Sequence, residues 1–184
     1  MILYNPKIRD YPRLVKVRSA WGKIPEILQD IIMRFNIKTD VALEFGVEQG
    51  RSTSAIANYF KRVIGVDTFC YNITSMEDSK PSNFYDVLKI LRRFYNIQLI
   101  ETRFEEFIKH DIYEKYDLIH VDLIHYYKPT YLCGEWSVQH SDCVLFHDTD
   151  MPEIMKVCED LSGKYNFEFY NYPHYGGLGI LIKK

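Results

Sequence analysis

Paired cysteines and long apolar runs are both missing from this sequence of 184 residues. The four cysteines form no C-x-x-C pair and have no ligand-like spacing with histidine, which argues against a zinc or dithiol site. No stretch approaches the ~18 unbroken apolar residues of a membrane span. Charges interrupt every apolar run near the N-terminus, so no signal-peptide pattern is present. We therefore expect free thiols, no membrane partner and a reducing, cytoplasmic location.

A strong net charge of either sign is also missing. The formal charge of −2 at pH 7 predicts no bulk attraction to nucleic acid or to anionic lipid, so no nucleic-acid partner is expected. The charge is unevenly distributed near the start of the chain, because residues 1–23 hold six basic side chains and a single acid, Asp10. Such a run is usually a solvated arm. The alternative is a lid that meets an anionic substrate, or a dimer arm, which leaves a homodimer open.

Length and composition indicate a single domain. The chain lies within the range of about 100 to 200 residues that is typical of one domain, and its apolar content of 47% supports a sizeable core. We divide it into an N-terminal arm and helix (1–40) and a cofactor-binding core (41–184). No internal repeat or low-complexity tract separates them.

Short apolar runs alternate with helical patterns along the core. Strands are predicted at 41–46, 62–67, 97–100, 116–122 and 142–148, and helices at 25–36, 51–60, from 82, at 126–139 and from 150. Ser82 and Asp150 are expected to cap the helices that they precede. This alternation predicts an α/β, Rossmann-like, doubly wound and mostly parallel sheet of about seven strands. The last two runs, 166–172 and 178–183, form a hairpin and must be antiparallel, so one strand is reversed.

Acidic residues stand where four of the predicted strands end. They are Glu44, Asp67, Asp122 and Asp148. In an open parallel sheet, ligands bind beyond the carboxyl ends of the strands, where the strand order reverses. Burying several like charges without partners is costly. We therefore expect a ligand, a metal or water among these carboxylates.

The segment 43–53 reads LEFGVEQGRST. Gly46 and Gly50 would let the backbone approach a ligand closely, and Asp67, at the tip of the next strand, can accept hydrogen bonds from both hydroxyls of a ribose. An adenosine ligand is therefore favoured over a plain turn. The dinucleotide pattern G-x-G-x-x-G is missing, and Glu48 would lie near the phosphates of NAD. A cofactor without phosphate, such as S-adenosylmethionine, meets no such repulsion.

At this point the sequence resembles the class I S-adenosylmethionine-dependent methyltransferases. It is most similar to a small group that includes macrocin-type sugar O-methyltransferases and cephalosporin hydroxylase-like proteins, and more distantly to catechol O-methyltransferase. The matching segments lie in family order between about 41 and 183, and they read LEFGVEQGRST, IGVD, LIHVDLIH, VLFHDT and GGLGI. The family's reversed final strand agrees with the predicted hairpin.

The resemblance implies a set of binding residues. The positions implied for the cofactor are Glu44, Gly46, Val47, Glu48, Gly50, Ser52, Asp67, Thr68, Phe104 and Asp122. Within this set, the glycine turn lines the methionine half, Asp67 holds the ribose, and Phe104 lies where the family usually contacts adenine. Asp122 and Asp148 occupy positions that hold a divalent metal in metal-dependent members, so Mg²⁺ is an optional second cofactor.

The implied reaction is methyl transfer to a hydroxyl of a small molecule or a sugar. The protein has to align the acceptor and remove its proton. Asp122 and Asp148 would bind Mg²⁺, which lowers the pKa of the hydroxyl. His125 or His147 could accept the proton, since histidine titrates near neutrality. The structural alternatives are loop-capping roles for the two aspartates, a solvated His125, and a His147 that only supports the site by hydrogen bonding.

Two other functions remain open. One is a non-catalytic module that binds S-adenosylmethionine, since the short chain leaves little room for a substrate-capping domain. The other is an NAD-linked oxidoreductase, which is weakened by Glu48 and by the lack of a second domain.

Overall fold

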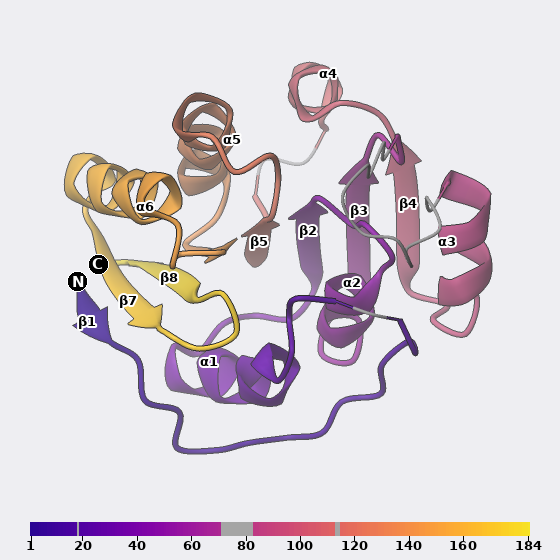
Figure 1. The fold of residues 1–184 in the computed structure, drawn as a ribbon, viewed down its shortest axis with the longest axis horizontal. Helices are drawn as coiled ribbons and strands as arrows, with labels where there is room; N and C mark the ends of the chain where they lie inside the picture. Colours follow the sequence, from indigo (N-terminus) through magenta and orange to yellow (C-terminus); the bar gives the residue numbers. More distant parts are fainter. Residues whose placement is uncertain (18, 71–82, 113–114) are drawn as a thin grey trace.

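The protein is a three-layer α/β structure built on an eight-stranded sheet, as Figure 1 shows. The computed structural model describes residues 1–17, 19–70, 83–112 and 115–184. The strands are β1 (Ile2–Leu3), β2 (Val41–Phe45), β3 (Arg62–Asp67), β4 (Ile97–Glu101), β5 (Leu118–Val121), β6 (Cys143–His147), β7 (Phe167–Tyr172) and β8 (Leu178–Lys183). They are ordered β1-β7-β8-β6-β5-β2-β3-β4. Only β8 runs antiparallel to its neighbours among the described strands, which confirms the predicted fold class and the reversed strand.

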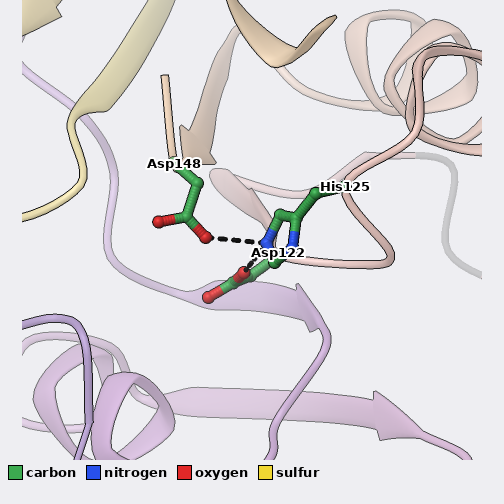
Figure 2. Close-up of side chains that lie close together, drawn as sticks. All are labelled: Asp122, His125 and Asp148. Carbon is green, nitrogen blue, oxygen red and sulfur yellow. Dashed lines mark ion pairs between the residues drawn. The ribbon is translucent and has the colours of Figure 1, made fainter. Parts of the chain in front are cut away.

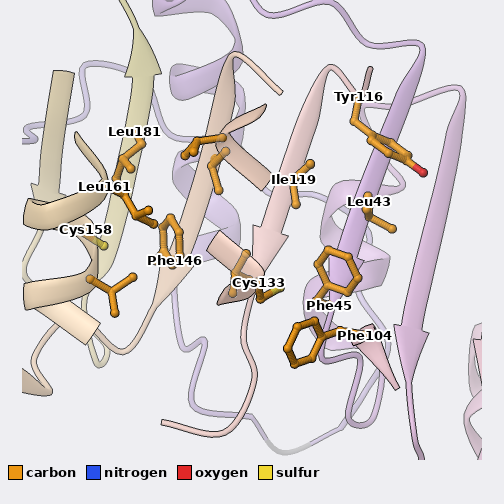
Figure 3. Packing of buried hydrophobic residues seen from close by; sticks show 14 of the residues in the cluster. Leu43, Phe45, Phe104, Tyr116, Ile119, Cys133, Phe146, Cys158, Leu161 and Leu181 are labelled. Carbon is orange, nitrogen blue, oxygen red and sulfur yellow. The ribbon is translucent and has the colours of Figure 1, made fainter. Parts of the chain in front are cut away.

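Helices cover both faces of the sheet. They are η1 (Ile24–Ile27), α1 (Leu28–Arg34), α2 (Arg51–Ile56), α3 (Phe84–Leu91), α4 (Phe104–His110), α5 (Tyr127–His140) and α6 (Pro152–Tyr165). Helices α4, α5 and α6 lie on one face and η1, α1 and α2 on the other, while α3 lies beside β4 (Figure 1). Each face has its own buried cluster. Figure 3 shows the first, in which Phe45 and Phe146 of the sheet pack with Cys133 and Leu161 of the helices.

The alternation of side chains along β2 assigns each residue to a face. Leu43 and Phe45 belong to the cluster under α4–α6, and Ala42 belongs to the cluster over α1 and α2. A parallel strand covered on both sides needs apolar residues at nearly every position. Glu44 is the exception on this strand, and it faces the same side as Ala42.

Two predicted helix caps were wrong by one residue. Asn83 caps α3, because its side chain accepts a hydrogen bond from the main-chain N of Asp86 at 3.1 Å; Ser82 lies outside the described residues. Met151 is the N-cap of α6 and makes no side-chain cap. Pro152 sets this start, because proline at the first helical position fixes a helical φ and needs no N–H partner. Asp150 therefore lies in the preceding turn.

Two elements were not predicted. The short β1 pairs in parallel with β7 and raises the strand count to eight, since the N-terminal arm returns to the edge of the sheet. Helix α4 was read only as a cofactor-contact segment. Within the predicted helix at 25–36, the first turn is the 3₁₀ helix η1. Residues 71–82, between the predicted strand at 62–67 and helix α3, lie outside the described part of the chain.

Two expectations about the chain as a whole can be compared with the structure. All four cysteines are free, and three of them are buried. Among the helices of the described residues, none combines the length and apolar character that a membrane crossing requires.

Candidate active site

The strand order reverses between β2 and β5. From β2 the chain proceeds through β3 to β4 in one direction, and from β5 it proceeds to β6 in the other. A ligand crevice is expected beyond the carboxyl ends of these two strands. Gly46 directly follows β2 with φ +93°, and a β-carbon there would lie 1.8 Å from the main-chain oxygen of Asp122. Only glycine lets the two strand ends approach so closely.

The turn after β2 is held by the carboxylate of Asp67. Gly46, Glu48 and Gly50 all adopt positive φ angles, of 93°, 50° and 82°. Asp67 accepts main-chain N–H groups of Val47 at 2.8 Å and Glu48 at 2.9 Å, and a third from Phe69 at 2.8 Å. The turn and the tip of β3 thus form one unit. A ribose contact of Asp67 stays a prediction.

The other residues predicted around the cofactor have different environments. Val47 and Ser52 are buried and Thr68 is exposed. The ring of Phe104 lies 6.4 Å from that of Phe45 and belongs to the core under α4–α6. The adenine contact of Phe104 stays a prediction.

The side chain of Glu44 is not exposed in the crevice. Its side chain is fully buried, accepts a hydrogen bond from the Thr53 hydroxyl, and lies 2.9 Å from Nδ1 of His120. Both carboxylate oxygens of Glu44 therefore have protein partners, and its predicted place in the cofactor site stays a prediction. No role of His120 was predicted from the sequence. The strand register could have found it, since His120 is paired directly opposite Glu44 in an apolar setting.

The loops after β5 and β6 bring three side chains together (Figure 2). Nε2 of His125 lies 2.7 Å from Oδ2 of Asp148 and 3.6 Å from Oδ1 of Asp122. Asp148 has φ +59°, a left-handed conformation that non-glycine residues rarely adopt and that is often found at functional sites. Asp122, His125 and Asp148, each predicted from the sequence, thus lie together, and their roles stay predictions.

His147 contacts both carboxylates of this cluster. Its Nδ1 lies 3.1 Å from Asp148 and 3.4 Å from Asp122, and its Nε2 is 3.2 Å from the main-chain oxygen of Tyr175. A carboxylate and a carbonyl only accept hydrogen bonds, so both ring nitrogens donate and the ring is an imidazolium. With both nitrogens engaged, His147 cannot accept a proton in this arrangement, and the supporting role is the one that fits.

The carboxylates and the imidazoles shift one another's pKa values. Asp122 and then Asp148 raise the pKa of His125 from 6.5 to about 10. Burial alone would lower the pKa of His147, but the same two carboxylates outweigh it and raise it to about 10. Burial likewise opposes ionisation of Asp122 and Asp148, yet the two histidines hold both carboxyl pKa values below normal. A general-base role for His125 at neutral pH is therefore not supported in the metal-free cluster.

The cluster fits a divalent cation. One ligand atom from each of Asp122, His125 and Asp148 lies within 4.8 Å of the others. Nε2 of His125 is close to Asp148, yet it is not aligned for a hydrogen bond. This nitrogen can bind a cation once the ring has lost its proton. Carboxylates suit Mg²⁺ or Mn²⁺, and the imidazole donor adds a ligand more usual for transition ions.

Comparisons with known proteins find relatives by structure only. No family model matches the chain, and no curated protein matches its sequence. The O-methyltransferase NovP is similar with a TM-score of 0.67 at 12% identity, over 89% of this chain and 78% of NovP. A Streptococcus mutans protein, SMU.1697c, described provisionally as a methyltransferase and solved with S-adenosylhomocysteine, gives 0.61 at 12% identity over 91% and 99%. Aeropyrum pernix fibrillarin with natively bound S-adenosylmethionine gives 0.57 at 15% identity over 79% and 67%. The chain therefore has the fold of class I S-adenosylmethionine-dependent methyltransferases.

Proposed function

We propose that the protein is an S-adenosylmethionine-dependent methyltransferase that acts on a hydroxyl of a small molecule or sugar. One observation carries this proposal: the glycine turn held by Asp67 and the Asp122–His125–Asp148 cluster flank the same switch point of the sheet. The fold shared with the cofactor-bound fibrillarin and SMU.1697c structures supports it. The resemblance to macrocin-type enzymes remains part of the proposal.

In this proposal the glycine turn binds the cofactor and Asp67 faces its ribose. The methyl group is transferred by in-line displacement, so the main task of the chain is to hold the acceptor hydroxyl near the sulfonium. Asp122, His125 and Asp148 hold a divalent cation, Mg²⁺ or a transition ion. When bound, the cation lowers the pKa of the acceptor hydroxyl. Since the His125 side chain is 40% exposed, water can reach the site and carry the proton away.

The local charge argues against a dinucleotide cofactor. Burial, and then the charges of Asp122 and Asp67, raise the pKa of Glu48, so the mouth of the turn is already rich in negative charge. A pyrophosphate would add to this repulsion, whereas the sulfonium and ammonium groups of S-adenosylmethionine would reduce it. We therefore do not propose an NAD-linked activity.

Binding and turnover are tested in that order. Isothermal titration calorimetry should detect S-adenosylmethionine and S-adenosylhomocysteine but not NAD. Release of S-adenosylhomocysteine is then measured with a panel of hydroxylated acceptors, with and without Mg²⁺ or Mn²⁺. Absence of binding would remove the proposal. Binding without turnover on any acceptor would favour the non-catalytic module.

A further inference from the structure

Trp21 lies between two histidines of the sheet, although it comes from the N-terminal arm. It is buried to 1% exposure. The centroid of its ring is 4.8 Å from that of His120 on β5 and 6.0 Å from that of His147 on β6. The indole therefore packs on His147, which contacts Asp122 and Asp148. It also packs on His120, which is paired with Glu44.

Two buried polar atoms at this contact have no hydrogen-bond partner among the described residues: Nε1 of Trp21 and Nε2 of His120. Buried polar groups are almost always paired. Since Nδ1 of His120 faces the carboxylate of Glu44, that nitrogen carries the proton and Nε2 is an acceptor, while an indole N–H only donates. The two atoms are therefore complementary, one a donor and the other an acceptor.

The arm is fixed to both halves of the crevice at this point. The guanidinium of Arg51, next to the glycine turn, donates to the main-chain oxygen of Gly22 at 3.3 Å. Gly22 also lies against Tyr175, since a β-carbon at Gly22 would be 2.4 Å from the tyrosine ring. The main-chain oxygen of Tyr175 accepts from His147. The turn at Trp21 and Gly22 thus joins the cofactor side to the loop that orients His147.

We propose that Trp21 is a positioning residue of the active site. It holds the His147 ring so that Nδ1 faces Asp122 and Asp148, and it ties this ring to the buried Glu44–His120 pair. The N-terminal arm then completes the cation-binding half of the crevice, a role distinct from a solvated arm. The inference rests on the proposed function for its purpose, but its geometry can be tested without turnover.

The test uses the full chain with Trp21→Leu, Trp21→Phe and the control Trp136→Phe. Trp136 is a matched control because it also packs on a histidine, with its ring centroid 4.0 Å from that of His140, on the opposite face of the sheet. Calorimetry with Mn²⁺ alone measures cation affinity. Nitrogen-15 NMR of the metal-free protein observes the histidine rings, including the Nε2–H of His147 that is bonded to Tyr175.

Substitutions behind metal ligands weaken affinity by about 10- to 100-fold, so we expect a loss of about tenfold in Trp21→Leu, a smaller loss in Trp21→Phe and none in Trp136→Phe. The protected Nε2–H signal of His147 should disappear in Trp21→Leu and persist in Trp136→Phe. Folded Trp21 variants that keep both wild-type readouts would overturn the inference. If Trp21→Leu does not fold, Trp21→Phe decides by the same readouts. If the wild type binds no Mn²⁺, the metal part of the proposed function fails, and the His147 signal alone decides the role of Trp21.

Discussion

The two halves of the crevice hold their carboxylates by different means. On the β2–β3 side, Asp67 accepts three main-chain N–H groups. On the β5–β6 side, Asp122 and Asp148 face the imidazoles of His125 and His147, and no main-chain donor to either carboxylate is found among the described residues. The first half is held by the backbone and the second by side-chain charge.

This difference sets what each half responds to. Main-chain N–H groups do not titrate, so the hydrogen-bond donors on the cofactor side keep the same charge at every pH. The imidazoles do titrate, and a cation can replace their charge beside Asp122 and Asp148. The cofactor side should therefore be sensitive to backbone substitutions and the acceptor side to pH and metal. Each prediction below tests one side of this comparison.

The largest effect is expected from Gly46→Ala. The new β-carbon would lie 1.8 Å from the main-chain oxygen of Asp122, at φ +93°, so strand ends that cannot separate easily must move apart. We expect a loss of about 3 kcal/mol or more in unfolding free energy, together with loss of S-adenosylmethionine binding. Thermal unfolding and calorimetry measure both. The control is Gly163→Ala in α6, where no atom lies within 4 Å of the added carbon; equal melting of the two variants would contradict the prediction.

Asp67→Asn comes next. An amide NH₂ in place of one carboxylate oxygen leaves at least one main-chain N–H without its acceptor, at about 1–3 kcal/mol of stability. Asp117→Asn is a matched control, because Asp117 accepts the N–H groups of Asp40 and Val41 at the opposite end of β2, at 2.7 and 2.9 Å. Both variants should lose stability in urea titrations. Only Asp67→Asn should weaken S-adenosylmethionine binding, by about tenfold or more for a charged hydrogen bond; equal affinity in the two variants would remove Asp67 from the cofactor site.

The acceptor side should lose stability at alkaline pH when no metal is bound. The pKa of His147 is raised from 6.5 to about 10, so its stabilising contribution is complete below pH 6.5 and is lost as pH rises through about 10. The pKa values of Asp122 and Asp148 are lowered, so their contribution is lost only at acid pH. With chelator present, we expect a loss of about 2 kcal/mol between pH 6.5 and 10, which lowers the melting temperature by roughly 5 °C, since 1 kcal/mol corresponds to about 2–4 °C at this size.

His147→Gln provides the comparison for this pH profile, because it keeps a polar side chain but does not titrate. The difference in melting temperature between the two proteins should shrink as pH rises. A constant difference over the whole range would show that the charge of His147 does not hold the cluster. Asp67→Asn should leave the shape of the profile unchanged.

The fold and the acidic residues at the carboxyl edge of the sheet could be predicted from the sequence, because both follow from periodicity. Alternating elements and acids at strand ends placed Asp67, Asp122 and Asp148 at one edge of the sheet. Sequence reasoning did not predict the burial of Glu44 against His120, because the same end-of-strand rule does not say which face a side chain takes. The face follows from the parity of the position along the strand, which Glu44 shares with Ala42.

The contacts of the N-terminal arm could not be predicted for a different reason. Trp21 meets His120 and His147 across about 100 and 126 positions of sequence, as the residue numbers give, and no local pattern encodes such a contact. The starts of α3 and α6 were predicted with a smaller error, because capping patterns locate a helix start to within a residue or two.

The smallest effect is expected from Glu48→Gln, which lies where the two halves meet. Burial and the charges of Asp122 and Asp67 raise the pKa of Glu48, so removing its charge relieves repulsion. In the metal-free protein at pH 7 we expect a stability gain of a few tenths of a kcal/mol, about the size of other partly exposed charge effects. Glu105→Gln, an exposed position in α4, should change stability less. The charge of Glu48 interacts with Asp122 and Asp67, so the gain in stability should vanish when Mn²⁺ neutralises the acceptor side. Urea titrations with and without the ion measure this difference. A gain that persists unchanged with Mn²⁺ would show that Glu48 does not sense the charge of the acceptor side.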